Sequence, residues 1–517
     1  MEIDGLGHWL HRRRLRQPHT LAVICGDVTL TYGDLADAVD RTAGALASMG
    51  VRKGDRVAML GENSPEFIQV MFACFHLGAV YVPINTRLAP PEVQHVLDDS
   101  GAKVLVHDTE LAQRADAALA LTRRAAEITV LAIGGAQLGK TDFAQTVAAA
   151  EPRLAFEPVS IEDPAAIIYT SGTTGTAKGA VLSHRNLTFV AINTIIDYDV
   201  VSDDVALMIS PLFHVASLGM GALPCILKGA TLVVERRFDP GRALALIEKH
   251  GVTMMSGVPT TYQLIADHPN WDATDLSSLK KLTCGGSAAA PRIIEAYEKR
   301  GLRFSQGYGM TETSPGATSL SANMTLEKAG SVGLPHFFSH VRVMREDGTP
   351  AAVREVGEIQ IIGPNVFSGY LGLEEATRNA FTDDGWYKSG DLGYLDEDGY
   401  LFIAGRLKDM IISGGENIYP IEVEARIAAL EGVTGVAVIP QPDPDWGEVP
   451  VAVLTLADGV EMDLETLRAR LDGVVARYKL PKRVIVVDDL PRTASGKVRK
   501  FELLDQLQKD GLIPTGG

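Results

Sequence analysis

The sequence predicts an α/β protein with a large N-terminal domain and a smaller α+β domain at its carboxyl end. Up to about Gln306, short apolar runs alternate with segments of helical periodicity, a rhythm typical of parallel sheets flanked by helices. Beyond Val341 the pattern changes to short alternating segments joined by Asp-Gly turns, which predicts a small β-rich subdomain. A further α+β segment follows from about Asp409, so we place a domain boundary between residues 406 and 407.

The individual elements follow from hydrophobic spacing and turn residues. Apolar residues recur at helical spacing after Thr31 until Gly50 ends the helix. The first elements are a helix over 31–49, a strand over 56–60, a helix over 64–77 and a strand over 78–83. Later strands are expected near 165–169, 205–209, 231–234, 252–256, 279–284 and 303–306. The Ala-rich residues 110–150 are expected to form peripheral helices and loops, and the last domain a helix over 421–430 with strands over 436–439 and 451–456.

The composition fits a soluble globular enzyme. A chain of 517 residues is too long for one core, and 46% of its residues are hydrophobic while 22% are charged. The net charge of −17 argues against a nucleic-acid binder, because an acidic surface repels a phosphate backbone. The acidic composition does not exclude a local basic pocket that binds a nucleotide. We therefore expect small-molecule partners, no nucleic acid, and a monomer or homodimer.

The cysteines and the basic N-terminus bear on the compartment. The four cysteines have no paired spacing, which indicates free thiols in a reducing cytoplasm and neither a disulfide framework nor a zinc site; they are Cys25, Cys74, Cys225 and Cys284. No secretory signal is visible, and no apolar run approaches the roughly 18 residues of a transmembrane helix. The basic residues 11–16 are expected to form a solvated helix face, and a weak contact with a membrane surface stays open.

The most informative stretch runs from Tyr169 to Ala180 and follows a predicted buried strand. Its glycines let backbone N–H groups approach an anion, its hydroxyls donate, and its lysine adds a positive charge. It predicts a phosphate-binding loop made of Thr170, Ser171, Gly172, Thr173, Thr174, Gly175 and Lys178. A P-loop is rejected because its second Gly and its Mg²⁺-binding hydroxyl are missing. A flexible linker is disfavoured, since linkers rarely follow a buried strand directly.

Two further clusters follow predicted strands, where open α/β sheets expose their ligand crevices. In the cluster that ends at Glu312, this carboxylate can bind Mg²⁺, Thr311 can reach a phosphate, and Tyr308 offers a flat face for a purine base. Taken alone, a Gly-Tyr-Gly sequence is as often a structural turn as part of a binding site. The second cluster could cover the other face of the base with bare backbone; it consists of Gly285, Gly286, Ser287 and Ala288.

Three clusters toward the carboxyl end add polar groups. Asp391 lies in a Gly-flanked turn and is a natural acceptor for two ribose hydroxyls, although such a turn alone is more often structural. Residues 405–420 combine charges at the predicted boundary with the glycines of a mobile loop. Residues 491–500 form a basic segment near the end of an acidic chain, where a solvated tail is the alternative.

Together these five clusters, in this order, resemble the adenylate-forming superfamily, and more closely its acyl-CoA synthetases. The resemblance covers nearly the whole chain and rests on the phosphate loop and on the Tyr-Gly-Met-Thr-Glu, Ser-Gly-Asp, Gly-Arg-x-Lys-Asp and Gly-Lys motifs. It implies an adenylation domain over residues 1–406, a mobile lid domain over 407–517, and an active site between them. It also implies the use of ATP, Mg²⁺ and coenzyme A.

For the first reaction, the resemblance implies that the carboxylate of the substrate attacks the α-phosphate of ATP and releases pyrophosphate. The loop 170–178 would hold the β- and γ-phosphates, with Thr311 beside it, and Glu312 would bind the metal. Asp391 with Arg406 would bind the ribose. Lys497 would neutralise charge as it spreads over the reacting oxygens.

For the second reaction, the resemblance implies a rotation at Lys408 that withdraws Lys497 and brings a new loop to the thiol of coenzyme A. That loop contains Gly414, Gly415 and Glu416. His214 matches a family position that lines the acyl and thiol channels, although a lone His after Phe is otherwise more often a core residue.

The acyl pocket is expected from residues 215–221, 256–259, 285–288 and 309–315, and therefore includes Val215, Ser256, Gly257, Gly285 and Gly309. These segments are mostly small and apolar, which suits a lipophilic chain or a flat aryl acid. No Asp follows the aromatic residue of the 211–214 motif to bind an amino group, so amino-acid activation is not expected. The segments also lack an Arg that could pair with a second carboxylate, which disfavours a malonate-type substrate. A medium- to long-chain fatty acid is the expected substrate, and an aryl or cinnamate-type acid is the alternative. An acyl-AMP ligase that loads a carrier-protein thiol is the rival enzyme class.

Overall fold

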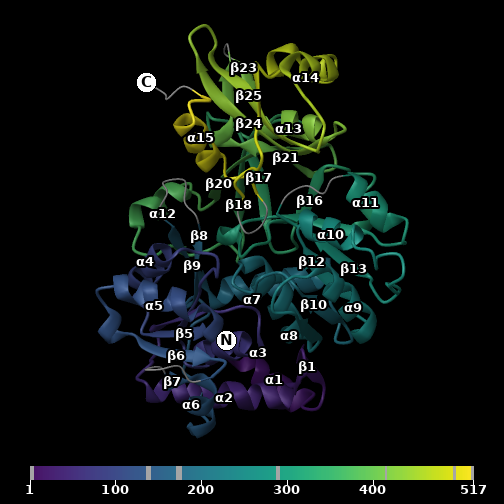
Figure 1. The fold of residues 1–517 in the computed structure, drawn as a ribbon. Helices are drawn as coiled ribbons and strands as arrows, with labels where there is room; N and C mark the ends of the chain where they lie inside the picture. The colour runs from purple at the N-terminus through teal and green to yellow at the C-terminus, as the bar shows by residue number, and fades with distance from the viewer. Residues whose placement is uncertain are drawn as a thin grey trace. The chain divides into compact units, whose positions relative to one another are not determined.

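The computed structural model describes residues 5–135, 141–170, 177–286, 291–413, 416–492 and 497–513. The chain forms two compact units. Unit 1 contains residues 1–341 and 361–387, and unit 2 contains residues 342–360 and 388–517. The predicted boundary between residues 406 and 407 separates a fixed domain from a mobile lid. The two compact units do not test such a motion, so this boundary stays a prediction. Figure 1 shows the elements by their labels.

The first sheet of unit 1 has parallel strands at its centre and an antiparallel edge. In spatial order its strands are β19 (Gly369–Tyr370), β9 (Lys178–Ser183), β8 (Pro164–Thr170), β4 (Val80–Pro83), β3 (Arg56–Leu60), β5 (Val104–Asp108), β6 (Thr129–Ile133) and β7 (Thr141–Asp142). Helices α4 (Pro90–Ser100) and α5 (Ala112–Leu121) share a buried apolar core with it and lie alongside it in Figure 1. The parallel centre places the ends of several strands at one edge, as open α/β sheets do.

The second sheet of unit 1 is also parallel at its centre and antiparallel at both ends. Its strands are, in spatial order, β16 (Ser331–Pro335), β15 (Thr318–Leu320), β14 (Phe304–Tyr308), β13 (Lys281–Cys284), β12 (Met254–Gly257), β10 (Val205–Met208), β11 (Thr231–Val234), β1 (Leu21–Cys25) and β2 (Val28–Thr31). One face buries its apolar side chains against α9 (Pro240–His250), α10 (Pro259–Ala266) and α11 (Pro291–Glu298). The expected α/β class is therefore confirmed, with mixed rather than purely parallel sheets.

The other helices of unit 1 are α1 (His8–Arg16), α2 (Tyr32–Ser48), α3 (Pro65–His76), α6 (Phe143–Ala149), α7 (His184–Asp197), α8 (Leu223–Lys228) and α12 (Glu374–Ala380). The basic face of α1 is only partly solvated, because Arg14 pairs with Asp37 and Asp40 of α2. Among the described residues, no helix has both the length and the apolar character that a membrane span requires. All four cysteines are free thiols.

One predicted region differs from the structure. Residues 110–150 were expected to contain only helices and loops, but they include β6 and β7, which extend the first sheet beyond β5. The side chains of Leu131, Ala132 and Ile133 are buried in β6. The run is only five residues long and lies between Ala-rich helices, so its apolar periodicity is too short to separate a strand from a helix.

Unit 2 contains the predicted β-rich region and the predicted α+β segment. A first group of strands follows the spatial order β17 (His340–Met344), β18 (Gly357–Ile362), β20 (Tyr387–Leu395) and β21 (Leu401–Arg406). A second sheet contains β22 (Ile411–Ser413), β23 (Glu416–Ile418), β24 (Val433–Asp443), β25 (Gly447–Leu456) and β26 (Arg483–Val486). Helices α13 (Pro420–Ala428) and α14 (Leu464–Leu471) pack on one face of this sheet, and α15 (Lys500–Lys509) contributes to a second core.

Asn186 joins a helix start to a distant segment of unit 1. Its side chain completes a capping box with Ser183 at the start of α7. Its amide Nδ2 also donates to the carbonyl oxygens of Pro364 and Val366, at 2.8 and 2.7 Å. Asn186 is fully buried, so these two carbonyls have little access to water that could replace the amide.

We therefore predict that Asn186→Ala lowers the free energy of unfolding of unit 1 by about 3 kcal/mol, because it removes a cap and leaves two buried carbonyls unpaired. Thr31→Ala is the matched control, since it removes the exposed capping box of α2 and should cost only about 1 kcal/mol. Urea denaturation measures both, and equal losses in the two variants would contradict the bridging role of Asn186.

Candidate functional site

The motif that contains Glu312 forms a tight turn directly after β14. Tyr308 is the last residue of this strand, and residues Thr311–Thr313 form one turn of 3-10 helix. The hydroxyl of Thr313 accepts a hydrogen bond from the Met310 N–H and donates to the carbonyl of Pro315. Glu312 is only 9% exposed. The turn thus buries a carboxylate that the sequence alone placed beside the phosphates.

A buried amide holds this turn from outside. Asn365, which is fully buried, donates through Nδ2 to the carbonyl oxygens of Thr313 and Gly316, at 3.0 and 2.6 Å. Its Oδ1 accepts a hydrogen bond of 2.8 Å from the hydroxyl of Ser339. The N–H of Phe367 donates to the carbonyl of Glu312 itself. Segment 363–370 therefore fixes the backbone at Glu312 and in the residues that directly follow it.

The predicted phosphate loop and Glu312 meet at Tyr370. Its phenol donates to Oε1 of Glu312 at 2.9 Å, and the Lys178 Nζ lies 5.4 Å from the centre of its ring. Thr170 and Lys178 are register partners in the antiparallel pair β8–β9, so the two described ends of the loop are adjacent. The structure therefore brings Lys178 and Glu312 together through a residue that the sequence analysis did not single out.

Several predicted site residues lie outside the described ranges. They are Ser171, Gly172, Thr173, Thr174 and Gly175 of the phosphate loop, Ser287 and Ala288 of the base-binding cluster, and Gly414 and Gly415 of the thiol loop. Gly286, next to the second set, is described and has a φ of +85°, a conformation that suits glycine. Of the thiol loop, Glu416 is described and begins β23.

The donor set around Glu312 fits Mg²⁺ held together with a nucleotide. Among the described residues, no group of three or more His, Cys, Asp or Glu side chains is arranged to hold a metal by itself. Mg²⁺ commonly binds through one or two carboxylates while substrate phosphates and waters complete its shell. A single buried carboxylate beside Lys178 matches that arrangement, and a stand-alone protein metal site does not.

His214 follows β10 and precedes the π-helix Ala216–Ala222. Its Nε2 atom is buried and has no hydrogen-bond partner among the described residues. Burial lowers the pKa of His214 to about 4, and the positive charge of Arg87 acts in the same direction. The imidazole is therefore neutral at pH 7 and carries a ring nitrogen that a ligand could use.

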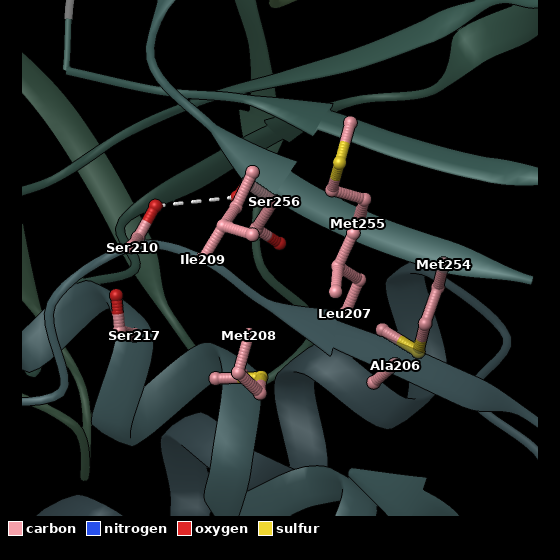
Figure 2. Close-up of a pocket in the computed structure, with 10 residues that line it drawn as sticks. Ala206, Leu207, Met208, Ile209, Ser210, Ser217, Met254, Met255 and Ser256 are labelled. Atoms are coloured by element: carbon pink, nitrogen blue, oxygen red, sulfur yellow. Dashed lines mark hydrogen bonds between the residues drawn. The ribbon is translucent and has the colours of Figure 1, made fainter. Parts of the chain in front are cut away.

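Two of the predicted acyl-pocket segments line one small cavity of roughly 10 Å³, about the space of one water molecule. Ser217 and Gly221 come from the π-helix and Ser256 from β12, and Figure 2 shows the hydroxyls of Ser210 and Ser217 on the same side of it. The Ser210 hydroxyl donates to the Ser256 carbonyl at 3.3 Å. The other lining residues are apolar and include Met208, Met254 and Met255.

The other residues predicted for the acyl pocket differ in the space around them. A Cβ added at Gly285 would have no described atom within 4 Å, whereas one at Gly309 would lie 1.4 Å from the carbonyl oxygen of Pro315. At Gly257 it would lie 3.2 Å from Thr261. Val215 is buried at the start of the π-helix. Among the described residues, Gly285 therefore has no close neighbour for a side chain, and Gly309 is required by close backbone packing.

Unit 2 gathers three other predicted residues. Asp391 and Arg406 are register partners on β20 and β21, and Nε of Arg406 lies 2.9 Å from Oδ1 of Asp391. Removal of the Lys497 ammonium from water lowers its pKa; the nearby Arg406 acts in the same direction and Asp391 opposes it. Lys497 therefore lies within the electrostatic influence of the predicted ribose pair. Lys408 follows in the short 3-10 turn Leu407–Asp409.

The residues that sequence reasoning missed are Asn365 and Tyr370. Both lie in Gly363-Pro364-Asn365-Val366-Phe367-Ser368-Gly369-Tyr370, where turn residues flank an apolar pair. Such punctuation indicates a backbone held in a fixed turn, which could have drawn attention to the segment. It gives no clue that Asn365 and Tyr370 contact a motif more than 50 residues earlier.

The buried state of His214 predicts a pH dependence of stability. Its pKa falls from 6.5 in the unfolded chain to about 4 in the folded one, so the unfolded state binds the proton more tightly. The contribution of His214 to the free energy of unfolding should be fully present above pH 6.5 and should decrease as the pH falls toward 4. His214→Gln should lack this contribution, which amounts to about 3 kcal/mol at pH 4. Urea unfolding of both proteins from pH 4 to 8 tests this, and parallel pH profiles would contradict it.

Known proteins match the chain over nearly its full length. The family model described as AMP-binding enzyme matches residues 10–371, and the AMP-binding enzyme C-terminal domain matches residues 422–497. A feruloyl-CoA synthase from Amycolatopsis sp. is 47% identical, over 97% of this chain and 99% of that protein. The long-chain-fatty-acid–CoA ligase FadD13 from Mycobacterium tuberculosis is 37% identical, over 98% of this chain and 99% of that protein.

A solved structure has the same fold. ATP-bound MatB from Rhodopseudomonas palustris superposes with a TM-score of 0.88 at 31% identity, covering 99% of this chain and 100% of that chain. The architecture, the motifs and the relatives therefore agree with one another. The chain belongs to the AMP-binding enzymes of the adenylate-forming superfamily, and it is an AMP-forming acid–thiol ligase.

Proposed function

We propose that this enzyme converts an aryl acid of the hydroxycinnamate class into its coenzyme A thioester. The acid and ATP first give the acyl adenylate and pyrophosphate, and the thiol of coenzyme A then displaces AMP. The full-length match to a feruloyl-CoA synthase carries this proposal. A medium- to long-chain fatty acid, the substrate first expected from the sequence, is the second candidate, and the match to FadD13 favours it.

The side chains around the small cavity in Figure 2 support the aryl acid. The cavity has room for about one water molecule, so a ring binds there only after these side chains move apart. They combine methionines, which can adapt their shape, with the hydroxyls of Ser210 and Ser217. An aromatic ring with a hydroxyl or methoxy substituent can use both kinds of group. A saturated alkyl chain gains nothing from a hydroxyl and must desolvate it.

In the proposed first step, different residues bind different parts of the nucleotide. Lys178 and Glu312 serve the phosphate end, where bound Mg²⁺ would neutralise phosphate charge and orient the leaving pyrophosphate. Asp391, held by Arg406, accepts hydrogen bonds from the ribose hydroxyls. Lys497 stabilises the charge that develops between the carboxylate and the α-phosphate.

In the proposed second step, Lys408 acts as the hinge, and the loop that contains Glu416 lines the path of the thiol. His214 precedes the π-helix, and its neutral ring has an Nε2 atom with no partner among the described residues, which can accept a hydrogen bond from an incoming group. Coenzyme A is the proposed acceptor. A carrier-protein thiol is distinguished by supplying each acceptor alone and following the thioester that forms.

Pyrophosphate release with a panel of carboxylic acids tests the substrate directly. Hydroxylated and methoxylated phenylpropenoic acids should exceed octanoate and palmitate in kcat/KM by roughly 10-fold or more, since a mismatched group in an apolar pocket typically costs that factor. Unsubstituted cinnamate is the matched control for the serine hydroxyls and should fall between. A preference for the fatty acids would replace the aryl acid by the second candidate.

Gly285 offers a probe of the acyl pocket. Gly285→Val should leave the unfolding free energy nearly unchanged, because no described atom lies within 4 Å of the new Cβ. If the acyl group occupies that space, the variant should raise KM for the aryl acid by about 10-fold while KM for ATP stays constant. Steady-state kinetics with each substrate varied in turn provides the measurement. Unchanged KM for every acid would remove Gly285 from the pocket.

Lys497→Ala should block adenylation, with a loss on the order of 3–4 kcal/mol in transition-state stabilisation, because it removes one positioned charge. Thioester formation from a supplied acyl adenylate should continue, since that step no longer involves the α-phosphate attack. Lys500→Ala, which removes the partner of Glu424, controls for the loss of a basic residue in the same segment. Equal loss of both half-reactions in Lys497→Ala would count against the assignment.

A further inference from the structure

Tyr370 lies where two motifs of the nucleotide site come together, and it belongs to neither of them. It ends β19, which pairs with β9 so that Tyr370 is the register partner of Ala180. Its backbone N–H donates to the Thr377 hydroxyl at 2.9 Å, and its ring packs 4.9 Å from that of Phe367. The position of the side chain is thus fixed from the backbone and from one face.

The phenol of Tyr370 fixes the carboxylate of Glu312. Its hydroxyl donates to Oε1 at 2.9 Å, and burial raises the pKa of Tyr370, as does the nearby charge of Glu312, so the phenol keeps its proton. Among the described residues, Oε2 accepts no such bond. One carboxylate oxygen is therefore held in place, while the other keeps its lone pairs for a ligand. Carboxylates that bind metals are commonly oriented by a hydrogen bond of this kind.

The ring of Tyr370 meets the other charged group. The ammonium of Lys178 lies 5.4 Å from the ring centre, within the range of a cation–π contact. Lys178 is the last residue of the predicted phosphate loop and the first residue of β9. One side chain therefore contacts both a group suited to the metal and a group suited to the phosphates, and it does so through two separable parts, the hydroxyl and the ring.

We propose that Tyr370 is a positioning residue that holds Glu312 and Lys178 in the orientation that binds a magnesium nucleotide. This inference rests on the proposed use of ATP and Mg²⁺, but it does not depend on the identity of the acid. Tyr370 acts through its two neighbours, so it sets the affinity for the metal–nucleotide complex.

The test is calorimetric binding of an ATP analogue in which a methylene group replaces the α,β-bridging oxygen, with and without Mg²⁺. Tyr370→Phe keeps the ring and removes the hydroxyl. It should weaken binding in the presence of Mg²⁺ by about 10-fold and leave binding without Mg²⁺ unchanged. Tyr370→Leu removes the ring as well, so it should also weaken binding without Mg²⁺ by several-fold.

Two further variants separate positioning from general destabilisation. Tyr297→Phe removes another buried phenol of unit 1, whose hydroxyl donates to the Tyr262 carbonyl at 3.0 Å, and it should bind the analogue as the wild type does. Glu312→Gln combined with Tyr370→Phe should bind Mg²⁺ and the analogue no more weakly than Glu312→Gln alone, because the phenol acts through that carboxylate.

Unchanged affinity in Tyr370→Phe, an equal loss in Tyr297→Phe, or additive losses in the double variant would each overturn the proposal. Because the analogue binds without any acid, failure of the aryl-acid assignment leaves this test intact. A wild type that binds no adenine nucleotide at all would instead overturn the proposed function together with this inference.

Discussion

The site in unit 1 depends on one buried amide. Asn365 uses both hydrogens of Nδ2 on carbonyl oxygens that lie on either side of a tight turn, and Ser339 satisfies its Oδ1. A buried carbonyl without a partner costs on the order of 1–3 kcal/mol, so any other backbone path through residues 313–316 would lose these bonds without gaining water. The turn therefore has one arrangement. Glu312 directly precedes these residues, and its own carbonyl accepts a hydrogen bond from the Phe367 N–H, so it is held in a fixed place before any ligand arrives.

Much of the fold could be predicted from the sequence because short apolar runs bounded by turn residues do form its buried strands. The strand at 231–234 coincides with β11, and the strand at 56–60 coincides with β3, since each is a short apolar run bounded by turn residues. β6 was missed because no Gly or Pro separates its apolar run from the Ala-rich residues 112–128 before it, and its pairing with β5 is a contact that the sequence does not show. The antiparallel edges of both sheets were also out of reach, because pairing direction is decided by partners far away in the chain.

The candidate site was predicted unevenly for a related reason. Lys178, Glu312 and Asp391 could be named because carboxylates and lysines next to glycine-rich turns point to ligand chemistry without further context. Asn365 and Tyr370 carry no such local mark. Their importance comes from contacts with a turn more than 50 residues earlier in the chain, and only the fold creates those contacts. Residues that position the ligand-binding side chains, without a ligand-binding pattern of their own, therefore cannot be identified from a single sequence.

The π-helix after His214 has a consequence for how this scaffold could change its choice of acid. A π-helix holds more residues per turn than an α-helix, so losing one residue between 216 and 222 would return it to α geometry. The side chains before the deletion would rotate by about 100° relative to those after it. His214, Val215 and Ser217 would then face new neighbours, while α8 kept its own packing. A single-codon deletion could thus reshape the wall of the cavity in one step.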